Sequence, residues 1–165
     1  PNLIHPGQAF VFPAEWIPVE NGEILSYNIQ SPPQPTVRQN QKWVKVDVTD
    51  ATISLMNGND VYKTFRAATG RGVPGTETDW YSTAPGSYRV KSKSEIFSGS
   101  FLECANSYDG IEFDEQRQNR ITSFLDGKGG LTGPGITTGH IRLSLTGLKE
   151  VLDFVDIGDL VYVQW

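Results

Sequence analysis

The segment of this chain best suited to chemistry is a loop rich in Gly and Thr that presents His140 shortly before Arg142. The imidazole of histidine changes charge near neutral pH, so it can act as a general base on water or on an amine. Backbone N–H groups around Gly139 and His140 could hold an oxyanion, so these residues suit acyl transfer or hydrolysis.

A short helix is predicted directly after this loop. Apolar residues there recur at i, i+3, i+4 and i+7, namely Leu148, Val151, Leu152 and Val155. This spacing makes one apolar helix face. Ser144 is the predicted N-cap, because its hydroxyl can accept a hydrogen bond from an N–H group of the first turn. Residues 156–159 then end the helix, and residues 160–163 close the chain as a strand.

Upstream of the loop, the sequence has the pattern of strands. Residues 44–48 and 52–56 alternate apolar and polar side chains, and Asn57-Gly58 can form a tight turn into residues 61–68. The 17 Gly and 10 Pro indicate many turns. We therefore predict a mainly β fold that ends with a short helix and a last strand.

The N-terminal part of the chain differs from the rest, because proline interrupts each of its apolar runs. We predict that residues 1–41 form a Pro-rich extension that packs on a domain of residues 42–165. Trp16 and Tyr27 are the side chains expected to make this contact.

Composition narrows the possible functions. The net charge of −5 disfavours binding to duplex nucleic acid, which requires a basic surface. The single cysteine, Cys104, allows neither an internal disulfide nor a Cys-based zinc cluster, and we expect it to be a small buried hydrophobe. The chain has two histidines, His5 and His140. Because these are few ligands for a metal ion, we predict no metal site, and we predict no cofactor. No segment has the length and composition of a membrane span or a leader peptide, and a chain that starts at Pro1 suggests a processed or trimmed start.

The block TTGHIRLS, with the helix and strand that follow it, resembles the C-terminal motif of L,D-transpeptidase catalytic domains, Ser/Thr-His-Gly-Cys-x-Arg-x-Ser. Thr137 falls on the Ser/Thr of that motif, Gly139 on its Gly and Arg142 on its Arg. Two positions depart from it. Thr138 stands where the motif has His, and His140 stands where it has the nucleophilic Cys.

Other blocks resemble the same family in the same order along the chain. The hairpin that opens at Trp43 is similar to the start of the family's domain, and residues 83–90 (TAPGSYRV) are similar to its Thr-Pro-x-Gly-x-Phe segment. Asp126-Gly127 stands where the family has His-Gly, whose His activates the Cys. The resemblance covers residues 42–165 and implies a β-sandwich or barrel of mixed strands with the helix-then-strand ending.

The resemblance implies a bacterial cell-wall domain that lies outside the cytoplasm, in the periplasm or envelope or as a secreted protein. Since a thiolate nucleophile is replaced by an imidazole, we expect a pseudoenzyme that binds a peptidoglycan stem peptide or glycan, or a partner protein, in which His140 fills the nucleophile pocket. No nucleic acid and no membrane insertion are expected. The expected substrate-binding residues come from two segments. Thr137, Thr138 and Arg142 lie near His140 in the sequence, and Trp80 and Tyr81 lie in the loop of residues 71–82.

Two alternatives stay open at the level of sequence. Catalysis could survive as a peptidoglycan L,D-transpeptidase or hydrolase in which Asp126 orients His140. The chain could instead be a carbohydrate-binding β-module that uses Trp43, Trp80 or Trp165 as stacking platforms. Trp80 and Tyr81 could line a groove, or their loop could be a solvated connection with Trp80 folded back onto the protein.

Overall fold

The alternating pattern of residues 42–57 builds the first of two sheets. The computed structural model describes residues 19–20, 23–24, 31–75, 77–94, 107–114, 119–124 and 132–165. The first sheet has the order β5-β4-β3-β13-β7. Its strands are β3 (Lys42–Asp47), β4 (Thr52–Asn57), β5 (Asp60–Arg66), β7 (Gly86–Arg89) and β13 (Leu160–Gln164). The closing strand β13 runs parallel to β3 and antiparallel to β7, so the end of the chain completes the middle of this sheet.

The second sheet combines short strands from distant parts of the chain in the order β11-β6-β12-β10-β9-β8. Its strands are β6 (Ala68–Gly70), β8 (Ser92–Lys93), β9 (Ser107–Asp114), β10 (Asn119–Phe124), β11 (Gly133–Thr137) and β12 (Ile141–Leu143). The pairs β10–β12 and β11–β6 are parallel, and the others are antiparallel. Two further short strands, β1 (Val19–Glu20) and β2 (Glu23–Ile24), pair only with each other.

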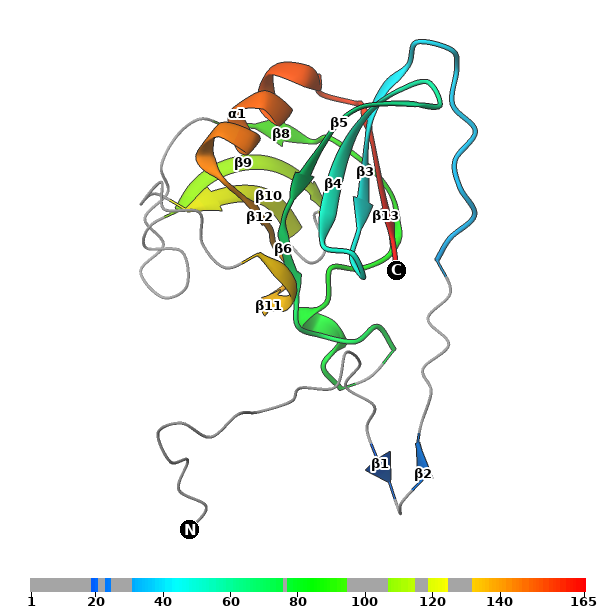
Figure 1. Cartoon of the computed structure of the whole chain (residues 1–165), viewed down its shortest axis with the longest axis vertical. Helices are drawn as coiled ribbons and strands as arrows, with labels where there is room; N and C mark the ends of the chain where they lie inside the picture. The colour runs from blue at the N-terminus through cyan, green and yellow to red at the C-terminus, as the bar shows by residue number, and fades with distance from the viewer. Residues whose placement is uncertain are drawn as a thin grey trace.

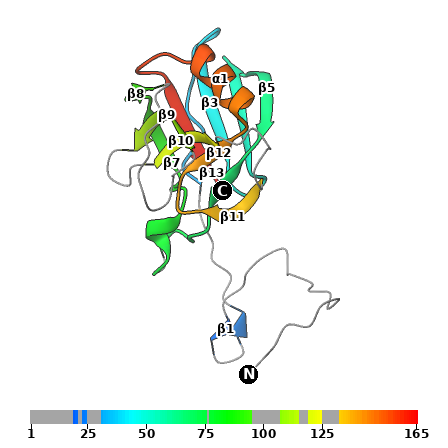
Figure 2. The same cartoon turned by 90° about the vertical axis from the view of Figure 1, so that its left-hand side faces the viewer.

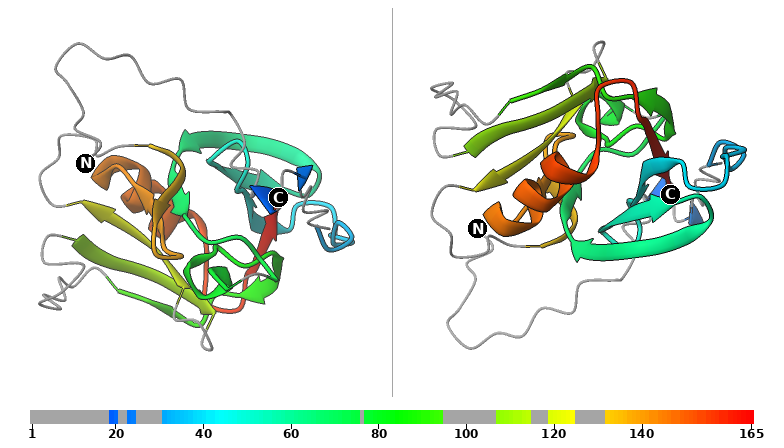
Figure 3. Two further views of the ribbon diagram at one scale, coloured as in Figure 1. Left: turned by 90° about the horizontal axis from the view of Figure 1, so that it is seen from below. Right: turned by 90° about the horizontal axis from the view of Figure 1, so that it is seen from above.

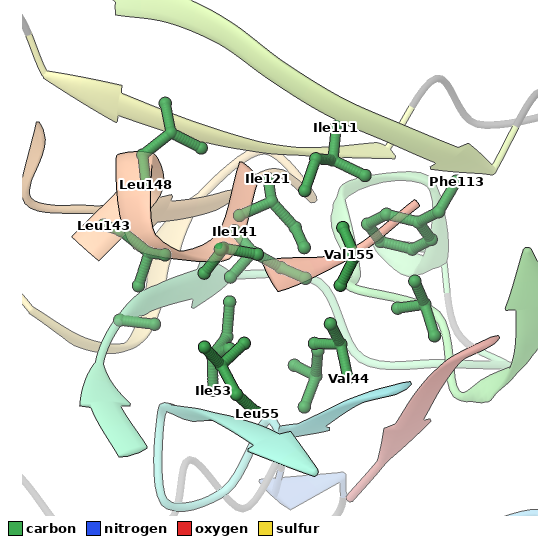
Figure 4. Close-up of a cluster of buried hydrophobic side chains, with 14 of the residues drawn as sticks. Val44, Ile53, Leu55, Ile111, Phe113, Ile121, Ile141, Leu143, Leu148 and Val155 are labelled. Atoms are coloured by element: carbon green, nitrogen blue, oxygen red, sulfur yellow. The ribbon is translucent and has the colours of Figure 1, made fainter. Parts of the chain in front are cut away.

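The two sheets face each other across one apolar core (Figures 1 and 3). Figure 4 shows that both sheets and the helix contribute side chains to it; the labelled ones are Val44, Ile53, Leu55, Ile111, Phe113, Ile121, Ile141, Leu143, Leu148 and Val155. Burying each such side chain stabilises the fold by about 1.5–3 kcal/mol. The prediction of a mainly β sandwich of mixed strands is confirmed.

One helix, α1 (Leu145–Phe154), lies across the open edge between the sheets (Figures 2 and 3). Its buried face is the predicted one: Leu148, Val151 and Leu152, with Val155 at the C-cap. The hydroxyl of Ser144 accepts a hydrogen bond from the N–H of Gly147, as expected of an N-cap. The ammonium of Lys93 donates to the carbonyl of Val155, where a positive charge favours the helix C-terminus.

The outer face of the first sheet is covered in part by residues 31–37. Four buried side chains form a second apolar cluster there: Trp43, Met56, Leu160 and Tyr162. Val37 packs against this cluster, and the Tyr162 hydroxyl donates to the carbonyl of Pro32. The hydroxyl of Ser31 donates to the carbonyl of Trp165 at 2.9 Å. This end of the Pro-rich stretch therefore lies against the sheet, while Trp16 and Tyr27 fall outside the described residues and the division at residue 41 stays a prediction.

The cap of α1 can be tested by removing its hydroxyl. Ser144→Ala should lower the free energy of unfolding by about 1 kcal/mol, because it leaves an N–H group of the first turn without its acceptor. Thr146→Ala, at an exposed position of the same turn, is the matched control and should change stability by less than half as much. Urea unfolding monitored by circular dichroism measures both, and equal losses would contradict the capping role.

Candidate functional site

The turn that carries His140 joins two strands on either side of β6. Strand β11 ends at Thr137, opposite Gly70, and β12 then passes Ala68 with Arg142 opposite it. Between the two strands, Gly139 has a φ of 110°, a conformation that other residues rarely adopt. The geometry of β6 therefore dictates where the chain reverses and where His140 emerges.

Thr83 holds this turn from the neighbouring segment. Its hydroxyl accepts a hydrogen bond from the N–H of Gly70 and donates one to the carbonyl of Gly139, each at 2.9 Å. The side chain is fully buried, so water does not compete for these bonds. One hydroxyl thus joins the end of β6 to the turn before β12.

Thr137 fixes the turn from within. Its hydroxyl donates to the carbonyl of His140 and accepts from the N–H of Gly139 at 3.3 Å. The residue is almost fully buried, so its side chain shapes the backbone around His140 rather than the outer surface. Thr138 and His140, in contrast, are partly exposed.

The strand beside this turn places Asn119 against it. A Cβ atom at Gly139 would lie 2.5 Å from Asn119 Oδ1 and 3.0 Å from the carbonyl oxygen of Ser82, so a larger residue fits only if Asn119 shifts. Because β10 runs parallel to β12, with Ile121 opposite Ile141, the start of β10 lies beside the turn and its end lies level with Ser144. Asp126 falls outside the described residues, and its pairing with His140 stays a prediction.

His140, at the end of the turn, and Arg142, in β12, are both half-buried. The Nδ1 atom of His140 and the Nε atom of Arg142 are themselves buried. Arg142 lies opposite Thr122 of β10. A half-buried imidazole next to a guanidinium can bind an acidic or polar ligand group, and the imidazole can also accept a proton.

Trp80 and Tyr81 lie in a short 3₁₀ helix, η1 (Asp79–Tyr81), whose loop is tied to the turn by backbone hydrogen bonds. The N–H of Arg71 donates to the carbonyl of Thr137 at 2.8 Å, and the N–H of Gly72 donates to the carbonyl of Tyr81 at 3.0 Å. The side chains are exposed, Trp80 by 66% and Tyr81 by 40%, so Trp80 is not folded into the core. The guanidinium of Arg71 lies 4.8 Å from the centre of the Tyr81 ring, a cation–π contact.

Trp43 and Trp165, the other two candidates for stacking on a sugar, are less accessible than Trp80. Trp43 is fully buried, and its indole N–H donates to the carbonyl of Gly58 at 2.7 Å, so it has no free face for a sugar. The indole N–H of Trp165 donates to the carbonyl of Thr83 at 3.1 Å. Of the three, Trp80 offers the exposed ring.

Sequence reasoning missed Thr83 and Asn119 as parts of this site. Thr83 opens the TAPGSYRV segment, but nothing in that segment indicates that its hydroxyl reaches Gly139. Asn119 carries no signal in the sequence, because its place beside Gly139 follows from the parallel pairing of β10 with β12.

Two observations concern other kinds of site. Within the described ranges, no three His, Cys, Asp or Glu side chains gather closely enough to hold a metal ion. The described part of the chain also contains no helix that is long and apolar enough to cross a membrane.

Comparison with known proteins identifies the fold. No protein-family model and no curated protein match the sequence. Among solved structures, an L,D-transpeptidase from Xylanimonas cellulosilytica superposes with a TM-score of 0.61 at 19% identity, over 79% of this chain and 64% of that one. An L,D-transpeptidase from Mycobacterium smegmatis gives a TM-score of 0.57 at 17% identity, over 76% and 59%. The catalytic domain of the E. faecium L,D-transpeptidase gives a TM-score of 0.57 at 18% identity, over 78% of this chain and 100% of that domain.

These matches confirm the resemblance to L,D-transpeptidase catalytic domains at the level of the fold. The chain spans less than two thirds of the Xylanimonas and Mycobacterium proteins, and its match covers the whole of the E. faecium catalytic domain. At these identities the comparison establishes the fold, while activity has to be argued from the site.

Removing the hydroxyl of Thr83 tests its role in the turn. Thr83→Val keeps the shape of the side chain but leaves the Gly70 N–H and the Gly139 carbonyl unpaired in the interior, and each such loss costs about 1–3 kcal/mol. We expect the free energy of unfolding to fall by at least about 2 kcal/mol, with NMR shifts concentrated at residues 137–142. Thr83→Ser retains the hydroxyl and should lose less than half as much.

Two variants can separate the effect of the close contact at Gly139 on stability from the effect of its positive φ. Gly139→Ala and Gly135→Ala both place a Cβ at a positive φ, but Gly135 has nothing within 4 Å of that position. Gly139→Ala should therefore be the more destabilising by about 1–3 kcal/mol, the cost of overpacking against Asn119. Thermal unfolding measures the difference, and equal effects of the two variants would show that Asn119 yields to the added methyl group.

Proposed function

We propose that this chain is an L,D-transpeptidase-fold domain that binds peptidoglycan stem peptides and has lost thiol catalysis. One observation carries the proposal: His140 follows Gly139 in the turn held by Thr83, at the position of the nucleophilic Cys in the motif that the sequence resembles. The single cysteine, Cys104, falls outside the described residues and is far from this motif in sequence.

The chemistry of the two side chains supports this proposal. A thiolate attacks a carbonyl carbon and forms a thioester that persists until an acceptor arrives. An imidazole is a poorer acyl acceptor for an amide substrate, and an acyl-imidazole hydrolyses readily. Thr138, at the position of the motif's His, provides no base. The altered positions thus remove the nucleophile while they leave groups that form hydrogen bonds.

The surroundings of His140 are suited to binding. Thr138 and His140 are partly exposed beside a turn whose backbone is fixed by buried hydrogen bonds, so a ligand would meet a rigid surface. Arg142 adds a positive charge, and Trp80 with Tyr81 adds an exposed aromatic edge tied to Thr137 through Arg71. Backbone peptide groups, sugars and carboxylates of peptidoglycan all find complementary groups among these residues.

The same fold supports a place in the bacterial cell envelope, outside the cytoplasm, since peptidoglycan lies there. The partner is then peptidoglycan itself, through its stem peptide or glycan. The net charge of −5 favours no nucleic-acid partner.

The proposal predicts binding without turnover. Calorimetric titration of the full chain with a stem tetrapeptide should give a saturable signal, and mass spectrometry after long incubation should show neither cleaved nor crosslinked peptide. His140→Ala should weaken binding by about tenfold, the effect of losing a hydrogen bond to the ligand. Lys149→Ala, at an exposed position of α1, is the control and should bind like the original chain.

The opposite result would identify an enzyme. Measurable hydrolysis or transfer that disappears in both His140→Ala and Asp126→Asn would establish the alternative in which Asp126 orients a basic His140. Absence of both binding and turnover with stem peptides would remove the peptidoglycan assignment.

A further inference from the structure

Trp165 follows the closing strand β13 and is held by a side chain of the Pro-rich stretch. β13 ends at Gln164, whose register partner in β3 is Asp47. The backbone N–H of Trp165 donates to the hydroxyl of Ser31 at 2.8 Å, and this hydroxyl donates to the carbonyl of Trp165 at 2.9 Å. Ser31 therefore makes with Trp165 the two bonds that a neighbouring strand would otherwise supply.

The indole of Trp165 connects this junction to the segment before β7. Its ring packs against the core between the sheets, and its N–H donates to the carbonyl of Thr83 at 3.1 Å. The hydroxyl of Thr83 in turn binds the Gly70 N–H and the Gly139 carbonyl. Four residues from distant parts of the sequence, Ser31, Trp165, Thr83 and Gly139, are thus joined one after another by hydrogen bonds.

Contacts of the neighbouring residues keep Ser31 in place. The Tyr162 hydroxyl donates to the carbonyl of Pro32, and Val37 packs against the apolar cluster on the outer face of the first sheet. In Figure 1 the described stretch begins beside the C-terminus and runs along this sheet. Pro32, Pro33 and Pro35 restrict its backbone, which lowers the entropic cost of holding it extended.

The side chains of the series transmit a displacement because they are stiff. An indole has only two rotatable side-chain bonds, so a shift of the Trp165 backbone moves its N–H. Thr83 is fully buried, and both bonds of its hydroxyl depend on its exact position. A shift of Trp165 therefore reaches the turn that carries His140.

We propose that Ser31 and Trp165 are positioning residues of the His140 turn, through which the N-terminal stretch sets the geometry of the site and its affinity for ligand. Loss of the Ser31 hydroxyl frees the backbone of Trp165 and increases the population in which Thr83 no longer holds Gly139. The effect on ligand affinity rests on the proposed function, whereas the effect on the turn does not.

Amide hydrogen exchange of the full chain tests the effect on the turn without a ligand. The Gly70 amide reports on the Thr83 hydroxyl, and the Gly139 amide, which donates to Thr137, reports on the turn. Ser31→Ala should speed exchange at both amides by at least about threefold more than at Leu55, in a strand that is paired on both sides. A role in global stability alone would speed exchange at Leu55 at least as much, and that result would overturn the proposal.

Tyr162→Phe is the matched control for the exchange experiment. It removes a hydroxyl that binds Pro32, next to Ser31, but leaves each bond from Ser31 to Gly139 in place. Exchange at Gly70 and Gly139 relative to Leu55 should therefore stay as in the original chain. Equal effects of Ser31→Ala and Tyr162→Phe on this ratio would overturn the role of Ser31.

A double variant tests whether Ser31 and Trp165 act in series. Trp165→Phe keeps a ring in the core but removes the indole N–H, so it should speed exchange at Gly70 and Gly139 as Ser31→Ala does. Adding Ser31→Ala to Trp165→Phe should then change this exchange by less than about twofold, because the connection is already broken. Fully additive effects would show that the two residues act independently and would overturn the series.

Calorimetric titration with the stem tetrapeptide extends the test to the ligand. Ser31→Ala should weaken binding by about threefold to tenfold, while Tyr162→Phe should bind like the original chain. If the peptide binds Ser31→Ala as tightly as the original chain, the proposed function stands and the control of affinity by Ser31 fails. If exchange at the turn changes as expected but no stem peptide binds, the positioning of the turn stands and the assignment to peptidoglycan fails.

Discussion

The hydroxyl of Thr83 is the interaction on which the candidate site depends. It joins the N–H at the end of β6 to the carbonyl in the turn before β12, and the carbonyl of the same residue accepts from the indole of Trp165 at the end of the first sheet. Both sheets and the site turn are thus linked through one buried residue on the segment that leads from β6 to β7. A buried hydroxyl with both its bonds made is favourable only in one geometry, so Thr83 selects the conformation of the turn.

Close backbone packing adds a second constraint on the same turn. The end of β6 approaches the segment of residues 81–83 so closely that a Cβ at Gly70 would lie 2.5 Å from the carbonyl oxygen of Tyr81. Gly139 is under a similar restriction from Asn119 and Ser82. The glycine of the TTGH block is therefore required by its positive φ and by packing, and its agreement with the L,D-transpeptidase motif is evidence for the fold and carries no information about catalysis.

Local patterns in the sequence predicted the parts of the fold that depend on local physics. Alternation gave the hairpin of β3 and β4, and helical spacing with a capping Ser144 gave α1 and its buried face. The second sheet was beyond this reasoning, because β6 lies between β11 and β12 and β10 runs parallel to β12, and such pairings join residues far apart in sequence. For the same reason Asn119 could not be predicted as a neighbour of the turn, while the pairing of Asp126 with His140 stays a prediction.

The positions that keep the family motif and those that depart from it play different structural parts. Thr137 and Gly139 match the motif, and both are buried in the turn. The hydroxyl of Thr137 makes hydrogen bonds within the turn, and Gly139 lies close to Asn119. Thr138 and His140 depart from it, and both are partly exposed where a ligand can reach them. Changes at exposed positions alter chemistry at little cost to stability, while changes at the buried positions would disrupt the turn. The buried pair, Thr137 and Gly139, matches the motif and the exposed pair, Thr138 and His140, does not, and this pattern supports the proposal of recognition without acyl transfer.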